Sequence, residues 1–440
     1  MSRLTHEGTR CPAGAMPPRP VDARAWFGRL SIALLCLSFS LSTAAAQTSA
    51  PVERWVGAWA SSQQVPEPNN ALPAGALDDA TLRQIVRLTL GGSQVRVRVS
   101  NVFGVTPLVI TAARIARPVV VDGPIIDPAT DRALTFAGRP GVTIPAGAEV
   151  TSDPLALETS ALDSLTVSLH FASMPSVQTS HPGSRATSYV AKGDRTGAAD
   201  LPDALRVDHW YNLSGVDVLG AGDRVAIAVI GDSITDGYGV VANSNTRWTD
   251  GFAERLQASI GTARFSVLNH GLGGNRVLLD GLGPNALARF ERDVLGQTGV
   301  GYFIIMEGVN DLGSLTRERP ASPQQHADLV HFVTAAYGQM VERARARGIV
   351  AIGATITPFS GSDYYRPPAE TEASRNAINA WIRTPGNFDA VIDFDAVMRD
   401  PANPTRLRPE VDNDGLHPSI AGYRAMADAA AEVISRIQQP

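Results

Sequence analysis

The chain has 440 residues, of which 44% are apolar, 18% charged and 6% aromatic, and its net charge is −5. This composition is typical of a folded protein, and the length predicts more than one domain. Because nucleic-acid binding needs clustered Lys and Arg, the acidic balance argues against a nucleic-acid partner.

The first 46 residues predict an export signal. Arg24 and Arg29 precede an apolar run over residues 30–41, and three alanines at 44–46 offer a cleavage site. We therefore expect a secreted or periplasmic protein that starts near Gln47. Both cysteines, Cys11 and Cys36, lie in this segment, so we expect no disulfide afterwards. No later apolar run reaches the ~20 residues of a membrane helix, so no membrane span is expected.

Residues 52–220 show mostly the alternation of apolar and polar side chains that predicts strands. Residues 86–90 alternate in this way, Gly91 and Gly92 interrupt the pattern, and residues 95–99 resume it, which indicates a strand, a turn and a strand. Residues 165–171 repeat the pattern. We predict an antiparallel β-sandwich domain over residues 52–220.

Residues 224–440 change to short, continuous apolar runs separated by helical patterns, which predicts a parallel sheet with helices on both faces. The expected strands are residues 225–230, 265–268, 302–306, 350–354 and 390–392. The expected helices are residues 246–259, 285–295, 322–347, 370–382 and 420–437. In such sheets ligands bind beyond the carboxyl ends of the strands, so the residues that follow each run are candidates for a site.

A serine follows the first of these strands, in the segment Gly-Asp-Ser-Ile-Thr-Asp-Gly that places Ser233 in a glycine-bounded turn. Such a turn would expose the hydroxyl at the edge of the sheet, although a turn or helix cap is the commoner role of a serine there. A glycine-rich loop at 269–275 and the segment Glu-Gly-Val-Asn-Asp at 307–311 follow the next two strands. All three segments are expected at the same edge.

A carboxylate and a histidine stand close together before the last helix. Asp414 precedes His417 by three residues. One nitrogen of a neutral imidazole can accept the serine proton while the other donates to an orienting carboxylate. Taken singly, this pair is better explained as a capping aspartate and an incidental loop histidine.

Together, the four segments resemble the consensus blocks of the SGNH hydrolases, the group that includes the GDSL lipases and esterases. The resemblance covers residues 225–437 and implies a flavodoxin-like, three-layer α/β/α domain. It also implies that Ser233 is the nucleophile, that Asp414 and His417 complete a triad, and that Ser233, Gly274 and Asn310 form the oxyanion hole. Gly273, next in the chain, remains an alternative to Gly274. The finer similarity, at residues 247–248 and 281–285, is to a bacterial arylesterase or acylhydrolase subfamily associated with xylan degradation.

The resulting expectation is an exported serine esterase that cleaves short-chain esters, including acetyl esters of polysaccharides, without a cofactor or a metal. Two other classes stay open: an O-acyltransferase with the same triad, and a non-catalytic carbohydrate-binding protein. Asp232 and Asp236 are expected to brace the nucleophile turn through backbone hydrogen bonds, and His270 to be a loop histidine bonded to backbone. Tyr364, Tyr365 and Trp248 are candidates to line a substrate site or simply to pack. The oligomeric state is left open.

Overall fold

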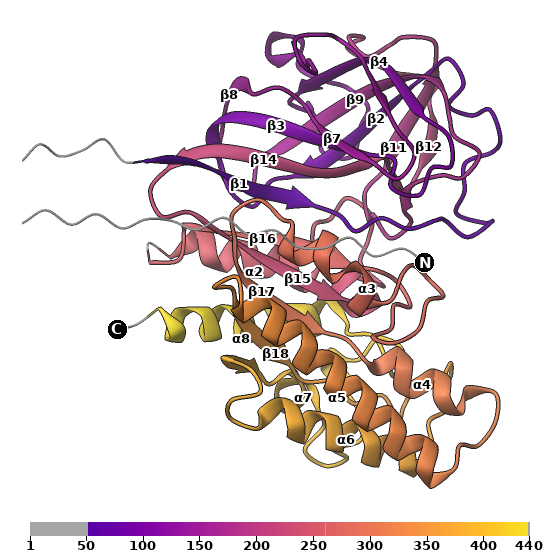
Figure 1. Cartoon of the computed structure of the whole chain (residues 1–440), viewed down its shortest axis with the longest axis vertical. Coiled ribbons are helices and arrows are strands. Elements are labelled where there is room, and N and C mark those ends of the chain that lie inside the picture. Colours follow the sequence, from indigo (N-terminus) through magenta and orange to yellow (C-terminus); the bar gives the residue numbers. More distant parts are fainter. Residues whose placement is uncertain (1–51, 260, 439–440) are drawn as a thin grey trace, which may run out of the picture. The chain divides into compact units, whose positions relative to one another are not determined.

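The computed structural model describes residues 52–259 and 261–438 (Figure 1). The predicted export signal at residues 1–46 lies outside these ranges. Strands β1 to β14, which we call the β region, are followed by the α/β region, which starts at strand β15.

The β region contains two large antiparallel sheets, as the alternation of its side chains predicts, and a small two-stranded one. One has the order β12-β11-β2-β9-β4-β5 with β6 beside β4, and the other has the order β1-β14-β3-β7 with β8 beside β3. Leu82 and Leu169 of the first sheet lie in one buried cluster with Val97 and Val218 of the second, so the sheets share a core. The strands of the first sheet are β2 (Ala80–Arg87), β4 (Leu108–Ala116), β5 (Arg132–Ala133), β6 (Val142–Ile144), β9 (Ser164–Ser173), β11 (Ser188–Lys192) and β12 (Leu205–Val207). Those of the second are β1 (Glu53–Ala60), β3 (Gly92–Ser100), β7 (Glu149–Thr151), β8 (Leu155–Thr159) and β14 (Leu213–Ala221), and β10 (Ser180–His181) pairs separately with β13 (Trp210–Tyr211).

Of the two strands predicted around Gly91 and Gly92, the second is β3, but the first is misplaced, because β2 ends at Arg87 and residues 88–90 lie outside it. The two strands do not pair with each other. Strand β2 pairs with β9 and β11, whereas β3 pairs with β14, β7 and β8, so the chain crosses between sheets at the two glycines. A Cβ on Gly91 would lie 2.2 Å from the carbonyl oxygen of Thr159, and one on Gly92 would lie 2.3 Å from that of Leu219. Glycine is required because the crossing passes directly against neighbouring backbone.

The α/β region has the predicted parallel sheet, with the strand order β16-β15-β17-β18-β19 that is typical of a flavodoxin-like fold. Ile227 and Val229 of β15 face one buried cluster, and Ala228 and Ile230 face another, so the sheet has a core on each face. The predicted strands agree closely with β15 (Val225–Gly231), β16 (Phe265–Gly271), β17 (Val300–Met306), β18 (Val350–Ala354) and β19 (Ala390–Ile392).

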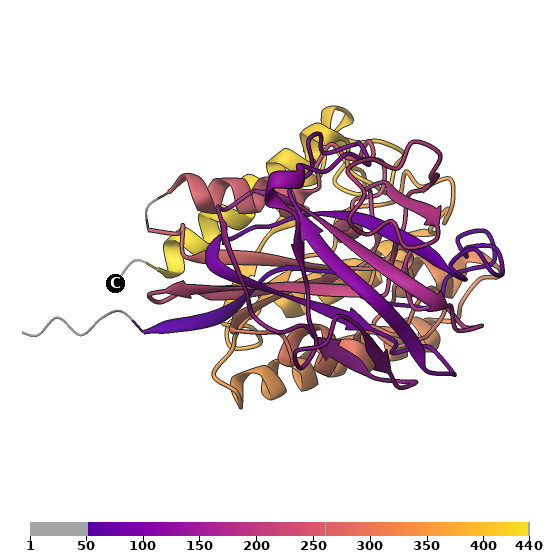
Figure 2. The same ribbon diagram turned by 90° about the horizontal axis from the view of Figure 1, so that it is seen from above.

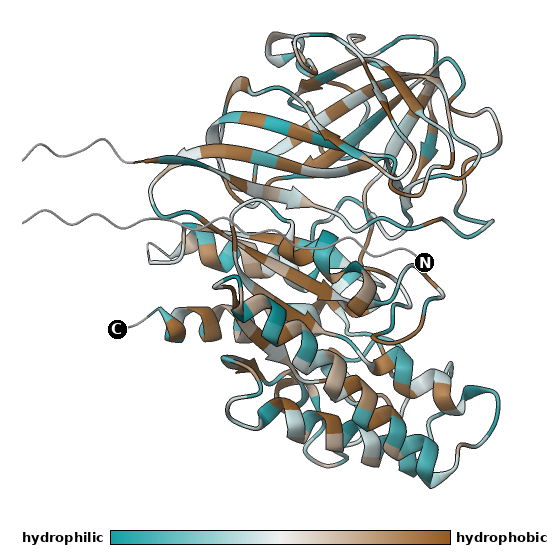
Figure 3. Ribbon diagram, viewed as in Figure 1, coloured by the Kyte–Doolittle hydropathy of each residue, from teal (hydrophilic) through white to brown (hydrophobic). Residues whose placement is uncertain are grey.

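Helices cover both faces of this sheet (Figure 2). Helices α2 (Trp248–Ala258) and α8 (Ile420–Ile437) supply one core, and α3 (Ala286–Phe290), α5 (Pro323–Arg345) and α6 (Ala369–Arg383) supply the other. In Figure 3 the strand β15 is mainly apolar, while α5 and α6 combine apolar and hydrophilic faces. A π-helical turn (Glu291–Leu295) extends α3. Sequence patterns did not predict the short helices α1 (Ser233–Asp236), α4 (Val309–Arg317) and α7 (Phe394–Met398), or the 3-10 turns Pro128–Thr130 and Pro409–Val411.

The β region packs against β16, the edge strand of the parallel sheet. The Ser266 hydroxyl donates to the Gly57 carbonyl at 2.6 Å, and the Thr89 hydroxyl donates to the Val267 carbonyl at 3.1 Å. Leu268 belongs to the same buried cluster as the sandwich core. The edge strand, which would otherwise present unpaired backbone groups, is thus covered by the β region.

Candidate active site

The three segments that were predicted to follow strands of the parallel sheet begin at the same level of that sheet. Gly231, at the end of β15, is in register with Gly271 of β16 and with Met306 of β17. Ser233 is the first residue of α1, and the carboxylate of Asp232 caps this helix by accepting from the Ile234 amide at 2.9 Å. The predicted serine turn is therefore the start of a short helix at the carboxyl edge of the sheet.

Ser233, His417 and Asp414 form a continuous hydrogen-bonded chain. The Ser233 Oγ lies 2.8 Å from His417 Nε2, and His417 Nδ1 lies 2.9 Å from Asp414 Oδ2. The other carboxylate oxygen, Asp414 Oδ1, accepts from the backbone amides of Leu416 at 3.1 Å and of His417 at 2.7 Å. These bonds fix the carboxylate, and the carboxylate in turn orients the imidazole so that Nε2 faces the serine hydroxyl.

Burial and hydrogen bonding together set the protonation of His417 and Asp414. Removal from water lowers the pKa of His417 below its ordinary value, although the hydrogen bond and charge of Asp414 act in the opposite direction. Burial opposes ionisation of Asp414, but hydrogen bonds from the backbone and ring of His417 prevail and lower its pKa. At neutral pH the imidazole is therefore neutral and able to accept a proton, next to an ionised carboxylate.

The residues expected to form the oxyanion hole line the same cavity as Ser233. The Ser233 amide is at the first position of a helix, where an N–H has no partner within the helix. Gly274 has a φ of +71°, and a Cβ there would lie 2.3 Å from the Leu282 side chain. Asn310 lies in the first turn of α4. Its Nδ2 donates to the Asn275 carbonyl at 2.7 Å, and an amide nitrogen carries a second hydrogen that this bond leaves for a ligand.

Tyr365 fixes the orientation of the Asn310 amide, a role that the sequence did not indicate. Its hydroxyl donates to Asn310 Oδ1 at 2.6 Å, and its side chain is buried. Since Oδ1 accepts from Tyr365, the Nδ2 group must point the other way, toward the loop that carries Asn275. Trp248, the other aromatic candidate for a substrate contact, is fully buried in the core against Phe252 and Phe394.

A buried polar network supports the turn that carries Ser233. The guanidinium of Arg289 donates to the carbonyl of Gly231 at 3.0 Å, to Glu307 Oε1 at 3.2 Å and to Asn275 Oδ1 at 3.0 Å. Burial raises the pKa of Asp232 to about 7 and raises that of Glu307 well above its ordinary value, and the two carboxyls also repel each other's charge. The network therefore retains protons that exposed carboxyls would lose at neutral pH.

Asp311 holds the loop that follows Gly274. Its carboxylate accepts from the amides of Val277 at 2.8 Å and Leu278 at 3.2 Å. Burial raises the pKa of Asp311 to about 6, against these hydrogen bonds, which lower it. Asn310 thus contributes its side chain to the candidate oxyanion hole, and the adjacent Asp311 supports the loop that follows Gly274.

Ser233, His417 and Asp414 line a cavity of about 1310 Å³, and both regions of the chain contribute to its wall. Tyr238 and Tyr364 are its partly exposed aromatic side chains, and the ring of Tyr238 stacks on that of His417 with centroids 4.1 Å apart. The β region supplies Gln64, Glu67, Asn69, Asn70, Pro182, Gly183, Arg185, Asp208 and His209. Ligands that enter therefore meet residues of the sandwich as well as of the parallel sheet.

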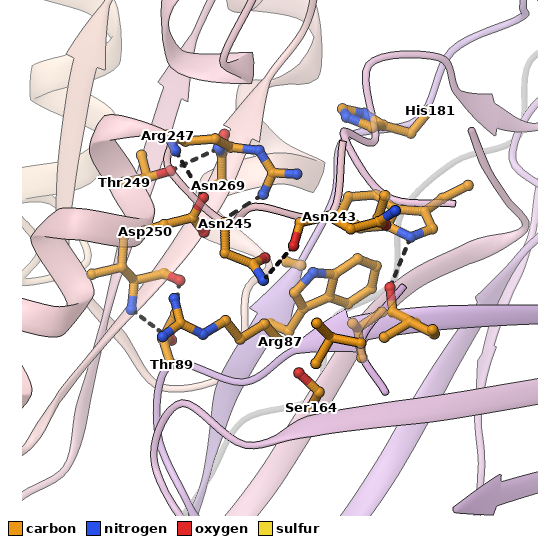
Figure 4. Close-up of a pocket in the computed structure, with 18 of the residues that line it drawn as sticks. Arg87, Thr89, Ser164, His181, Asn243, Asn245, Arg247, Thr249, Asp250 and Asn269 are labelled. Carbon is orange, nitrogen blue, oxygen red and sulfur yellow. Dashed lines mark hydrogen bonds and ion pairs between the residues drawn. The ribbon is translucent and has the colours of Figure 1, made fainter. Parts of the chain in front are cut away.

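Figure 4 shows a second, much smaller cavity, lined by Arg87 and Thr89 of the β region and by Asn243 and Arg247 of the α/β region. Its volume of about 40 Å³ is enough for water but not for a substrate. Within residues 52–259 and 261–438, no group of His, Cys, Asp and Glu side chains is arranged to hold a metal ion. Over the same ranges, every helix is too short or too polar to cross a bilayer.

Two of the supporting residues differ from the sequence expectation. His270 is in strand β16 rather than in a loop, and its Nδ1 lies 3.3 Å from the hydroxyl of Ser62 of the β region. Burial lowers the pKa of His270 to about 3, so the ring is neutral. Asp232 braces the nucleophile turn through a backbone amide as expected, but Asp236 does not, because its carboxylate faces His181 and Arg185.

A flavodoxin-like sheet with a Ser-His-Asp arrangement at its carboxyl edge defines the class of serine-dependent acyl hydrolases on an α/β/α fold. Residues 229–425 match the sequence profile of the GDSL-like Lipase/Acylhydrolase family. The match thus covers most of the α/β region of the chain.

Three solved structures each cover about half of this chain. A GDSL-like lipase from Bacteroides thetaiotaomicron has 17% identity, with 49% of this chain and 89% of that chain covered and a TM-score of 0.36. An acetyl xylan esterase has 17% identity, with 48% of this chain and 100% of that chain covered and a TM-score of 0.36. An α/β hydrolase enzyme from a Lake Arreo metagenome has 21% identity, with 48% of this chain and 96% of that chain covered and a TM-score of 0.35. No curated protein sequence matches this chain.

Proposed function

We propose that the protein is a carboxylic ester hydrolase with Ser233 as nucleophile, His417 as general base and Asp414 as the residue that orients the base. The observation that carries the proposal is the unbroken chain from Ser233 Oγ to His417 at 2.8 Å and from His417 to Asp414 at 2.9 Å. Its location at the floor of a large cavity gives an ester access to the hydroxyl.

In the proposed mechanism, His417 Nε2 takes the Ser233 proton while Oγ attacks the ester carbonyl. The negative charge that develops on the carbonyl oxygen is received by the amides of Ser233 and Gly274 and by Asn310 Nδ2. His417 then gives its proton to the leaving alcohol, and an acyl group remains on Ser233. Water, activated by the same imidazole, releases the acid and restores the hydroxyl.

For the substrate, we propose short acyl groups on polyhydroxylated alcohols, including acetyl groups on polysaccharides. The cavity wall supports this choice, because it includes amides and charged groups such as Gln64, Asn70 and Arg185 together with the rings of Tyr364 and Tyr238. Such a mixture hydrogen-bonds hydroxyl groups and stacks on sugar rings. A long acyl chain, in contrast, would need a continuous apolar channel.

The test is hydrolysis of p-nitrophenyl esters of increasing acyl length by the purified protein and by its Ser233→Ala variant. We expect rapid turnover of the acetate, a fall with chain length, and loss of turnover in the variant by about 10⁴-fold or more. Equal rates in the two proteins would refute the assignment of the nucleophile. Preferential transfer of the acetyl group to an added alcohol or glycan would identify an acyltransferase, whereas binding of glycans without turnover would favour a carbohydrate-binding protein.

We also propose that the protein acts outside the cytoplasm, on the basis of Arg24, Arg29 and the apolar run at residues 30–41. Expression of the full chain in a bacterial host, followed by fractionation and N-terminal sequencing, tests this. A processed chain that begins near Gln47 in the periplasm or medium is expected. An unprocessed chain confined to the cytoplasm would contradict it.

A further inference from the structure

Asp236 is the last residue of α1, the short helix that begins with Ser233, and its carboxylate is directed at the β region. Oδ1 lies 3.0 Å from His181 Nε2, and Oδ2 lies 3.6 Å from the guanidinium of Arg185. The Asp236 side chain is 3% exposed. A buried carboxylate needs partners, and here the β region supplies them.

His181 is itself held by two acceptor groups. Its Nδ1 lies 2.8 Å from the Ser62 carbonyl oxygen, which can only accept, so Nδ1 must carry a hydrogen. The contact between Nε2 and Asp236 then needs one more proton, either on the ring or on the carboxyl. The ring also stacks on Trp210, with centroids 5.6 Å apart and planes at 28°. The imidazole is therefore fixed on three sides and can hold Asp236 in one place.

Gly183 shows how closely the β region approaches this carboxylate. A Cβ added at Gly183 would lie 1.7 Å from Asp236 Oδ2. A larger residue would have to displace either the backbone of this segment or the C-terminal end of α1. The contact is thus a close fit of main chain against the nucleophile helix.

Arg185 connects the same segment to the general base. Its guanidinium lies 5.8 Å from the centre of the Tyr238 ring, on which it can exert a cation–π attraction. The Tyr238 ring stacks on His417. The charge of Arg185 also disfavours protonation of His417, because it contributes to the lowered pKa of that imidazole, after burial.

We infer that the β region is part of the catalytic unit: His181 positions the nucleophile through Asp236, and Arg185 positions the base through Tyr238. The inference rests on the proposed function, since it gives these two side chains a role in the same reaction. Neither is proposed to exchange a proton or a bond with the substrate. Both act by holding a neighbouring group in its reactive geometry.

The first experiment separates the two hydrogen bonds of His181 in the full-length protein. His181→Asn places an amide near the Nδ1 position and keeps the bond to Ser62, whereas His181→Gln reaches the Nε2 position and keeps the bond to Asp236. We expect kcat for p-nitrophenyl acetate to fall about tenfold in His181→Asn and by less than about threefold in His181→Gln, with KM little changed in both. Each variant keeps one of the two bonds, so their melting temperatures should be similar.

Equal losses of kcat in both variants, or losses that follow the melting temperature, would overturn the role of His181. The rate at which a fluorophosphonate labels Ser233 gives a second readout that needs no ester turnover. If the wild type labels but does not hydrolyse esters, the proposed function fails while the labelling rates of the two variants still decide the inference.

The second experiment tests Arg185 through the pH profile. The groups facing His417 are Asp414 on its own loop, Ser233 of α1, Tyr238 and Arg185. Arg185→Gln removes a positive charge, so the acid limb of kcat/KM should move to higher pH, whereas Arg185→Lys keeps the charge and should leave it nearly in place. An unchanged acid limb in Arg185→Gln would overturn the role of Arg185.

Discussion

Replacement of Tyr365 by Phe removes one oxygen from the support of the candidate oxyanion hole. In the wild type the Tyr365 hydroxyl donates to Asn310 Oδ1 at 2.6 Å, and the two side chains are buried. The variant leaves this acceptor without its donor, which costs about 1–3 kcal/mol when a buried polar group loses its partner. If about 1.4 kcal/mol of that cost appears in the transition state, kcat falls about tenfold.

The fall should stay below the loss on removing Asn310 itself, because the amide remains in place and is only less well oriented. Tyr364→Phe is the matched control: it makes the same chemical change one residue earlier, on a ring that is 58% exposed and whose hydroxyl contacts Arg317. Steady-state hydrolysis of p-nitrophenyl acetate measures both. A loss below about twofold in Tyr365→Phe, or an equal loss in Tyr364→Phe, would refute the orienting role.

Three further predictions concern the same site. Asn310→Ala should lower kcat by about 10²- to 10³-fold, the usual effect of losing one oxyanion donor, and a loss under about threefold in the esterase assay would exclude the residue. Because burial lowers the pKa of His417, the acid limb of kcat/KM should have its midpoint below the ordinary histidine value, and a midpoint above it would contradict the burial argument. Glu307→Gln removes a carboxyl whose pKa is raised in the folded state. The protonated carboxyl stabilises the folded state. This contribution is complete below the pKa that the group has in the unfolded chain, and it is lost as the pH rises through the pKa of the folded state. The melting temperature of the variant should therefore fall less than that of the wild type between about pH 5 and pH 8. Parallel curves would show that the carboxyl is ionised throughout.

The fold was predictable from the sequence where a single pattern decides the structure. The five apolar runs of the α/β region became its five strands because a strand buried on both faces is apolar throughout. Pairing was not predictable in the same way. Strands β2 and β3 look like a hairpin around Gly91 and Gly92, but which strands become neighbours depends on contacts far away in the chain.

The four segments that carry the candidate site could be located because each follows a strand or precedes a helix. Their resemblance to a known set of blocks named Ser233, Asn310 and His417, and the structure brings these side chains to one cavity. The supporting residues could not be found in this way. Tyr365 is 55 positions from Asn310, and His181 is 55 positions from Asp236, so no local pattern relates them.

Two hydrogen bonds between residues far apart in the chain meet behind Ser233, where Ser62 donates to Asp293, 231 positions away, and Arg289 donates to Ser62, 227 positions away. During synthesis the β region emerges well before its partners in the α/β region, and closing such long loops is slow. The hydrogen bonds behind Ser233 therefore form only when the β region and the α/β region have both folded and packed together. Recovery of hydrolysis during refolding would accordingly lag behind the return of secondary structure. The rate at which esterase activity returns would then report the rate of the final packing step.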